Sequence, residues 1–130
     1  MATILKNSIT NDIGITPEVI LTTKQNNRYT AIGLNLSNTT NSVVKVSIIM
    51  KQWEPLATTT PGVGDAGDNN TTIDPISVGY FLKDIMVAPQ SSLKAITNSE
   101  KLILAPNNSL EIKSNAPTSI DSIISFVEIL

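Results

Sequence analysis

The side chains in this sequence that could take part in chemistry are of few types, because its 130 residues include neither histidine nor cysteine. The two missing residue types remove the usual general base, the commonest metal ligand and every thiolate. Zinc hydrolases, Ser-His-Asp hydrolases and Cys-His proteases are therefore excluded in their ordinary forms. Disulfide bonds are excluded for the same reason.

Four carboxylates lie in or beside one segment rich in glycine, proline and asparagine: Glu54, Asp65, Asp68 and Asp74. Two carboxylates at a fixed separation could hydrolyse a glycoside, but no pattern here sets such a separation on rigid elements. The composition of Asp65–Asn70 suits a Ca²⁺ loop, since hard cations prefer oxygen ligands. However, it lacks the alternating acidic positions and the terminal glutamate of such a loop. We expect a solvated loop with no cofactor, no metal and no catalytic residues.

The same segment contains glycines at the spacing of a dinucleotide-binding fingerprint, in Gly62–Gly67. That fingerprint requires a preceding strand and a following helix, and neither is predicted here, so we expect no nucleotide site. Trp53, the single tryptophan, borders the segment. An exposed tryptophan often anchors a protein interface, whereas one at a strand end often completes the edge of a core. We predict that Trp53, Glu54, Asp65 and Asp68 form a partner-binding surface.

The elements that position these residues show a two-residue alternation of apolar and polar side chains, which is typical of half-buried strands. Val44, Val46, Ile48 and Met50 share one face of the clearest example. Short runs of this kind, separated by clusters of Asn, Pro, Gly and Ser, predict eight strands. These strands are 16–23, 28–36, 42–51, 78–88, 93–96, 101–104, 109–114 and 120–130.

Three details of this arrangement can be tested. We expect strands 28–36 and 42–51 to form a β-hairpin around the turn 38–41, with Ile32, Leu34 and Leu36 on one face of the first strand. Strand 120–130 is apolar on both faces from Ile123 onward, so it is either a central strand of a sheet or paired with another subunit. Residues 53–76 predict an exposed excursion of about 20 residues, which is long for a compact domain.

The fold class follows from this pattern. No segment has a helical apolar stripe, and seven to nine short strands at regular spacing are typical of a sandwich or barrel. We therefore predict an all-β, antiparallel β-sandwich of jelly-roll or Ig-like type, with one long loop at about 53–76. A chain of this length fits one domain covering 1–130.

Charge argues against several partners. The net charge is −2, only 15% of the residues are charged, and the nine Lys and Arg residues form no run. A nucleic-acid or anionic-membrane surface would cluster them, so we expect neither partner. The N-terminal residues do not resemble a secretory leader, and no apolar run approaches the ~18 residues of a membrane span.

Several segments resemble a class of small virion structural proteins of tailed bacteriophages. In that class, a Gly-aromatic strand ending in Asp precedes a Pro-x-Ser-Ser-Leu turn, a Lys-Leu-Ile-Leu segment and a final strand with Val-Glu-Ile. The matching segments are Tyr29–Asn38, Gly79–Asp84, Pro89–Leu93, Glu100–Leu104, Asn108–Leu110 and Phe126–Ile129.

The resemblance implies a non-enzymatic virion protein that binds the capsid surface as a decoration or cement protein, or binds the neck and tail. Its partners would be other virion proteins, namely the major capsid protein or the portal, neck or tail proteins, and it would be present in many copies or as a homo-oligomer. Assembly would take place in the host cytoplasm. An alternative function is a carbohydrate- or receptor-binding module of a tail fibre, in which Trp53 would contact the ligand.

Overall fold

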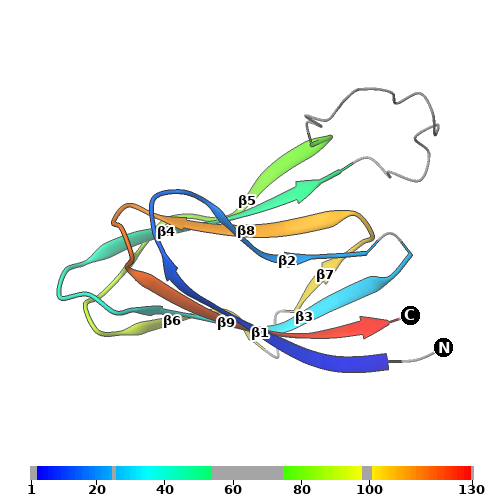
Figure 1. Ribbon diagram of the computed structural model, residues 1–130, viewed down its shortest axis with the longest axis horizontal. Coiled ribbons are helices and arrows are strands. Elements are labelled where there is room, and N and C mark those ends of the chain that lie inside the picture. The colour runs from blue at the N-terminus through cyan, green and yellow to red at the C-terminus, as the bar shows by residue number, and fades with distance from the viewer. Residues whose placement is uncertain (1–2, 25, 54–74, 98–100, 130) are drawn as a thin grey trace.

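The computed structural model describes residues 3–24, 26–53, 75–97 and 101–129 (Figure 1). Within these ranges the chain forms nine strands. The strands are β1 (Thr3–Ile13), β2 (Glu18–Thr22), β3 (Arg28–Asn38), β4 (Val44–Gln52), β5 (Ser77–Val87), β6 (Ser92–Ile96), β7 (Leu102–Leu104), β8 (Asn108–Ser114) and β9 (Ile120–Ile129). The eight strands predicted from the sequence are all present, and β1 is additional.

The strands form two sheets that pack face to face, which confirms the predicted antiparallel β-sandwich. The first sheet has the order β1-β9-β3-β6, with β7 also paired to β3, and the second has the order β2-β8-β4-β5. All strand pairs in both sheets are antiparallel. The described residues contain no helix long and apolar enough to cross a membrane. Most of the predicted loop, 54–74, lies outside the described residues.

The core lies between the two sheets and consists almost entirely of aliphatic side chains. On β4, Val44, Val46 and Ile48 are fully buried, as their alternation predicted. The inward side chains of β9 and β8 meet them from the facing sheet and the neighbouring strand. Burial of this aliphatic surface is the main force that holds the sheets together.

The predicted hairpin of 28–36 with 42–51 is wrong. β3 pairs with β9, β6 and β7 in the first sheet, whereas β4 pairs with β5 and β8 in the second. The turn between them crosses from one sheet to the other around the buried side chain of Asn38, whose Nδ2 donates to the carbonyls of Ser42 (2.8 Å) and Val87 (3.0 Å). Alternation shows which face of a strand is buried, but it does not identify the neighbouring strand.

The predicted face of β3 is also partly wrong. The register of β3 against β9 shifts between Ala31 and Gly33. This bulge inserts one residue, so Tyr29 and Ala31 face the core before it, and Leu34 and Leu36 face the core after it. Ile32, which was predicted to share the face of Leu34, is only half-buried.

The C-terminal strand β9 is a central strand, flanked by β1 and β3. The sequence left open whether this strand is central in a sheet or paired with another subunit, and the structure shows a central strand. Its inward residues, among them Ile124, are buried, while Ile123 on the outer face is 46% exposed. The outer face of the first sheet therefore keeps apolar side chains in contact with solvent.

Candidate functional site

Trp53 follows β4 directly and is fixed at both its backbone and its ring. Its backbone N–H donates to the carbonyl of Asn107 (2.9 Å), and its indole Nε1 donates to the hydroxyl of Ser109 on β8 (2.9 Å). The side chain is half-buried. Trp53 therefore presents one part of its ring in a defined orientation, which lowers the entropy lost when a partner covers it.

A charged pair lies beside the indole ring. The Lys51 Nζ is 5.9 Å from the ring centroid of Trp53 and 3.1 Å from the Oε2 of Glu111. Glu111 is buried, so Lys51 neutralises a carboxylate that solvent hardly reaches. Alternation along β4 places Ile49, Lys51 and Trp53 on the outer face of the second sheet, away from the core.

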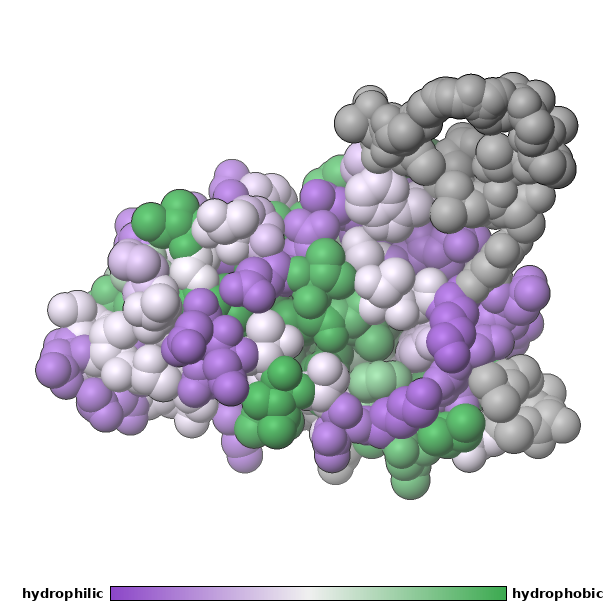
Figure 2. Space-filling model, viewed as in Figure 1, coloured by the Kyte–Doolittle hydropathy of each residue, from purple (hydrophilic) through white to green (hydrophobic). Residues whose placement is uncertain are grey.

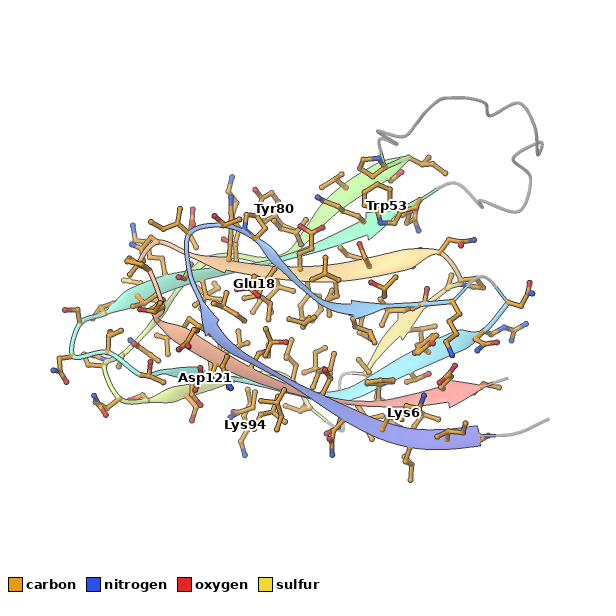
Figure 3. The ribbon with its side chains drawn as sticks, in the orientation of Figure 1. Lys6, Glu18, Trp53, Tyr80, Lys94 and Asp121 are labelled. Carbon is orange, nitrogen blue, oxygen red and sulfur yellow. The ribbon has the colours of Figure 1, made fainter. Side chains whose placement is uncertain are left out.

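Strand β5 adds an exposed apolar row to this outer face. Val78 pairs with Lys51, Tyr80 pairs with Ile49, and the N–H of Ile76 donates to the carbonyl of Gln52 (2.7 Å). Ile76, Val78 and Tyr80 are exposed. Figure 3 shows Trp53 and Tyr80 on the same outer side of the second sheet. We call the group Trp53, Ile76, Val78 and Tyr80 the Trp53 surface.

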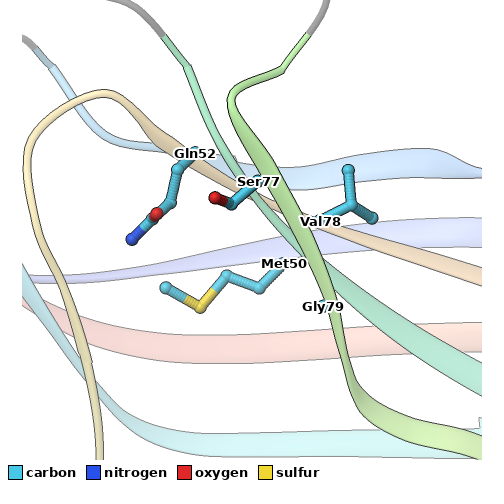
Figure 4. A pocket seen from close by; sticks show the side chains of 5 residues that line it. All are labelled: Met50, Gln52, Ser77, Val78 and Gly79. Carbon is cyan, nitrogen blue, oxygen red and sulfur yellow. The ribbon is translucent and has the colours of Figure 1, made fainter.

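The other face of the same two strands carries an open hollow of about 250 Å³, lined by Met50, Gln52, Ser77, Val78 and Gly79. In Figure 4, the side chains of Met50, Gln52 and Ser77 point to one side of the strands, and Val78 points to the other. A Cβ added at Gly79 would meet no atom within 4 Å. This end of the β4–β5 pair is thus exposed on both of its faces.

Of the four residues predicted to bind a partner, Trp53 lies on this surface. Glu54, Asp65 and Asp68 lie outside the described residues, and so do the predicted calcium-like and glycine-rich segments. Elsewhere in the described ranges, no three His, Cys, Asp or Glu side chains come together in a group that could hold a metal ion.

A second polar cluster, which sequence reasoning missed, surrounds the buried carboxylate of Glu128 on β9. The Lys6 Nζ lies 2.9 Å from Oε1, while Oε2 accepts from the Asn27 amide (2.6 Å) and the Tyr29 hydroxyl (3.0 Å). Lys24 Nζ is more distant, at 3.8 Å from Oε2. The available signal was position along the strand, because Glu128 has the same inward-facing alternation as Ile124 and Phe126.

The electrostatics of this cluster favour a permanent carboxylate. The hydrogen bond from Lys6 lowers the pKa of Glu128 to about 2, against the opposing effect of burial, and the donors Asn27 and Tyr29 lower it further. The same bond raises the pKa of Lys6, and burial raises the pKa of the Tyr29 hydroxyl. Glu128 therefore acts as a fixed charge that joins β1, β3 and β9, rather than as a group that exchanges protons near neutral pH.

No family model matches this sequence, and no curated protein matches it. Among solved structures, the chain is similar to one from the work titled "Bacillus endospore appendages form a novel family of disulfide-linked pili". The two chains are 12% identical, and the TM-score is 0.44 over 98% of this chain and 87% of that chain. A similarity at this level defines neither a family nor a function.

Proposed function

We propose that this protein is a non-enzymatic structural subunit of a multi-protein particle, and that the particle is the virion of a tailed bacteriophage. The observation that carries the proposal is the Trp53 surface, an apolar row on an edge strand beside an orientated tryptophan. Isolated apolar side chains are normal on a soluble protein, but a group of apolar side chains on an edge strand is typical of an interaction surface.

The choice of particle rests on the resemblance of the strand and turn segments to small phage virion proteins. Two of those segments contribute to the Trp53 surface and its support. Gly79–Asp84 lies in β5 and includes Tyr80, and Asn108–Leu110 lies in β8 and includes Ser109, which holds the indole. In this function the sandwich acts as a rigid support, and the partner is a capsid, neck or tail protein.

The experiment that tests the proposal is to find the protein in purified particles. Particles from the producing host would be purified by density gradient and their proteins identified by mass spectrometry, and the position of this chain would then be imaged by cryo-electron microscopy. We expect a fixed stoichiometry and ordered density with the Trp53 surface at a contact. Particles that lack the chain would overturn the virion assignment.

A matched pair of variants tests the surface itself. Val78 on β5 and Val19 on β2 lie on the outer face of the same sheet at opposite edges, and they are 55% and 52% exposed. We expect Val78→Lys to reduce incorporation into particles by at least about tenfold, corresponding to about 1.4 kcal/mol of lost contact energy. Val19→Lys should incorporate normally, and an equal loss in both variants would contradict a contact at the Trp53 surface.

One observation favours the alternative, a carbohydrate- or receptor-binding module. The indole of Trp53 is held rigidly beside the Lys51–Glu111 pair, and an aromatic ring next to charged groups suits stacking on a sugar together with hydrogen bonds to its hydroxyls. A glycan array with the wild-type protein and Trp53→Ala tests this function. Binding in the micromolar range that is lost in Trp53→Ala would replace the purely structural proposal.

A further inference from the structure

The strands that end the two sheet paths differ sharply in how they are protected from pairing with another chain. Along the sheet paths, β1 and β6 end the first sheet, and β2 and β5 end the second. An outermost strand leaves a row of backbone N–H and C=O groups without partners, and proteins commonly shield such rows with short strands or charged side chains. β2 and β6 are five residues each and carry Glu18 and Lys94. β1 and β5 are eleven residues each.

The two long edges also carry few charged residues. The single charged residue between Thr3 and Thr10 is Lys6, and its ammonium already contacts Glu128. From Ser77 to Leu82 there is neither a charged residue nor a proline, although the ammonium of Lys83 lies 5.0 Å from the ring centroid of Tyr80 and the register of β5 against β4 shifts twice between Tyr80 and Ile85. Both strands instead expose large apolar side chains, which are Leu5 and Ile9 on β1 and Val78 and Tyr80 on β5. Figure 2 shows hydrophobic patches along the lower margin of the molecule, where β1 runs in Figure 1.

These two open edges lie on opposite sides of the sandwich. β1 lies close to β2 and β8 of the second sheet, so the β1 edge lies on the β2 side of that sheet. β5 is at the other end of that sheet, beyond β8 and β4. Among the described residues, each side of the sandwich therefore has one long edge strand with no strand paired beyond it, and the two edges belong to different sheets.

We propose that the β1 edge of one copy pairs with the β5 edge of a second copy, so that subunits join head to tail through a sheet that continues between them. This inference rests on the proposed function as a structural subunit, and it names a second copy of the chain as the partner of that subunit. A single type of contact gives the backbone groups of both edge strands hydrogen-bond partners, whereas pairing of β1 with β1 would leave those of β5 without partners. A foreign partner would account for one open edge, but not for two of equal length.

Such a contact joins two different surfaces, so it does not close into a dimer and instead adds one copy after another. Its size is reasonable for this chain. A specific interface takes about 800 Å² per partner, and two of them would cover about a fifth of the 7471 Å² of accessible surface. The apolar side chains of β1 and β5 would supply the buried surface, and the free backbone groups would supply the register.

Two edge-blocked variants test the proposal by complementation. Leu5→Lys with Ile9→Lys blocks β1 and leaves β5 intact, and Val78→Lys with Tyr80→Lys blocks β5 and leaves β1 intact. By analytical ultracentrifugation, we expect wild-type protein to form a concentration-dependent series of oligomers and each variant alone to remain monomeric. An equimolar mixture should give a dimer that does not grow, because one open edge of each kind remains.

Introduced cysteines give a second, independent readout, since the sequence contains none. Leu5→Cys and Val78→Cys would be mixed and treated with a short bismaleimide. We expect crosslinked dimers that contain one copy of each variant, and a ladder of multimers from the doubly substituted chain. Crosslinked dimers from either single variant alone would indicate like-with-like pairing and overturn the proposal.

A matched control distinguishes blocking of an edge from general loss of surface hydrophobicity. Ile103 is 72% exposed on the first sheet, close to the 73% of Leu5, and it lies on the three-residue strand β7. Ile103→Lys should assemble like wild type, and near-ultraviolet circular dichroism should show that every variant keeps its fold. Wild-type protein that remains monomeric in the millimolar range would also overturn the proposal.

The outcomes separate this inference from the proposed function. Oligomers that form through β1 and β5 in a protein absent from virions would overturn the virion assignment alone. A protein that occupies virions but gives no dimer in the complementation mixture would overturn the pairing alone.

Discussion

Lys6 of β1 directs its ammonium inward to the buried Oε1 of Glu128 on β9, at 2.9 Å. The two residues are diagonal neighbours, because Ile4 is directly opposite Glu128 in the register and Lys6 is directly opposite Phe126. Most of β1 is exposed, and Ile13 is its single residue in the core cluster. The ion pair is thus the main side-chain contact that holds the first half of β1 on the sheet.

Removal of this ammonium should destabilise the protein. Lys6→Met leaves a buried carboxylate with two neutral donors and only the more distant Lys24 as a cation, and a poorly compensated buried charge is unfavourable. Lys24→Met is the control, since Lys24 Nζ is 3.8 Å from Oε2 and its side chain is 68% exposed. We expect a clear fall of the urea midpoint for Lys6→Met and little change for Lys24→Met. In amide hydrogen exchange, faster exchange in Lys6→Met should be concentrated along β1 and β9, and uniform acceleration would contradict this role.

Acid should weaken the fold through the same carboxylate. The pKa of Glu128 is lowered to about 2 from an ordinary value of 4.5, so the folded state binds fewer protons than the unfolded chain in this window. Its contribution to stability is complete above about pH 4.5 and is lost as the pH falls towards 2. Urea midpoints measured between pH 7 and pH 2 should fall more steeply for wild type than for Glu128→Gln below about pH 4.5. Parallel curves would show that the carboxylate is not the titrating group.

The single tryptophan makes the Trp53 surface directly observable by fluorescence. Ser109→Ala removes the acceptor of the indole Nε1 and should free the ring at a cost of about 1 kcal/mol. We expect a red shift of the emission and stronger quenching by acrylamide. Ser125→Ala, on β9 of the other sheet, should leave the emission unchanged. An unshifted spectrum in Ser109→Ala would mean that the bond does not set the orientation of the ring.

Two neighbouring isoleucines of β9 test the assignment of its faces. Ile124 is fully buried between the sheets, and Ile123 is on the outer face. Ile124→Ala should lower the free energy of unfolding by about 2–5 kcal/mol, since it leaves a cavity in the core. Ile123→Ala should lower it by less than about 1 kcal/mol in the isolated subunit. Equal losses in chemical denaturation would show that the outer face is covered even in the monomer.

Much of the fold could be predicted from the sequence, because most strands bury one face and therefore alternate clearly. β1 was missed for a physical reason. Its residues Thr3–Asn11 contribute no side chain to the core cluster. Their sequence therefore shows no regular alternation of apolar and polar residues from which a strand could be predicted. The sheet to which each strand belongs could not be predicted either, because long-range packing, and not the adjacent turn, determines which strands pair with β3.

For the candidate site, the position of Trp53 at the end of a predicted strand was a usable signal. By contrast, the donors to Glu128 come from two separate segments, Lys6 in β1 and residues 24–29, which only the fold brings together around β9.

The turn between β3 and β4 crosses from one sheet to the other instead of forming the predicted hairpin. The role of Asn38 in holding this turn can be tested by mutation. Its Oδ1 accepts from the backbone N–H of Thr40 (2.9 Å), and its Nδ2 bonds the carbonyls of Ser42 and Val87. Asn38→Ala would remove the side-chain donor to the buried carbonyl of Val87 and two further hydrogen bonds within the turn, which should lower the free energy of unfolding by about 1–3 kcal/mol. Asn41→Ala, in the same turn but exposed, should change it by less than about 0.5 kcal/mol.

Because Asn38 ties the end of β3 to the end of β5, its loss should also loosen the junction between the two sheets. Hydrogen exchange should accelerate first at Val87 and Ala88 in Asn38→Ala, before any change appears in β8 or β9. If the variant instead unfolds at a lower midpoint with uniform exchange, the side chain contributes to global stability but does not hold the crossing locally. Asn38→Asp offers a finer test, because it keeps the acceptor for Thr40 while it replaces the donor to the two carbonyls with a charge that they repel. It should therefore be at least as destabilising as Asn38→Ala at neutral pH.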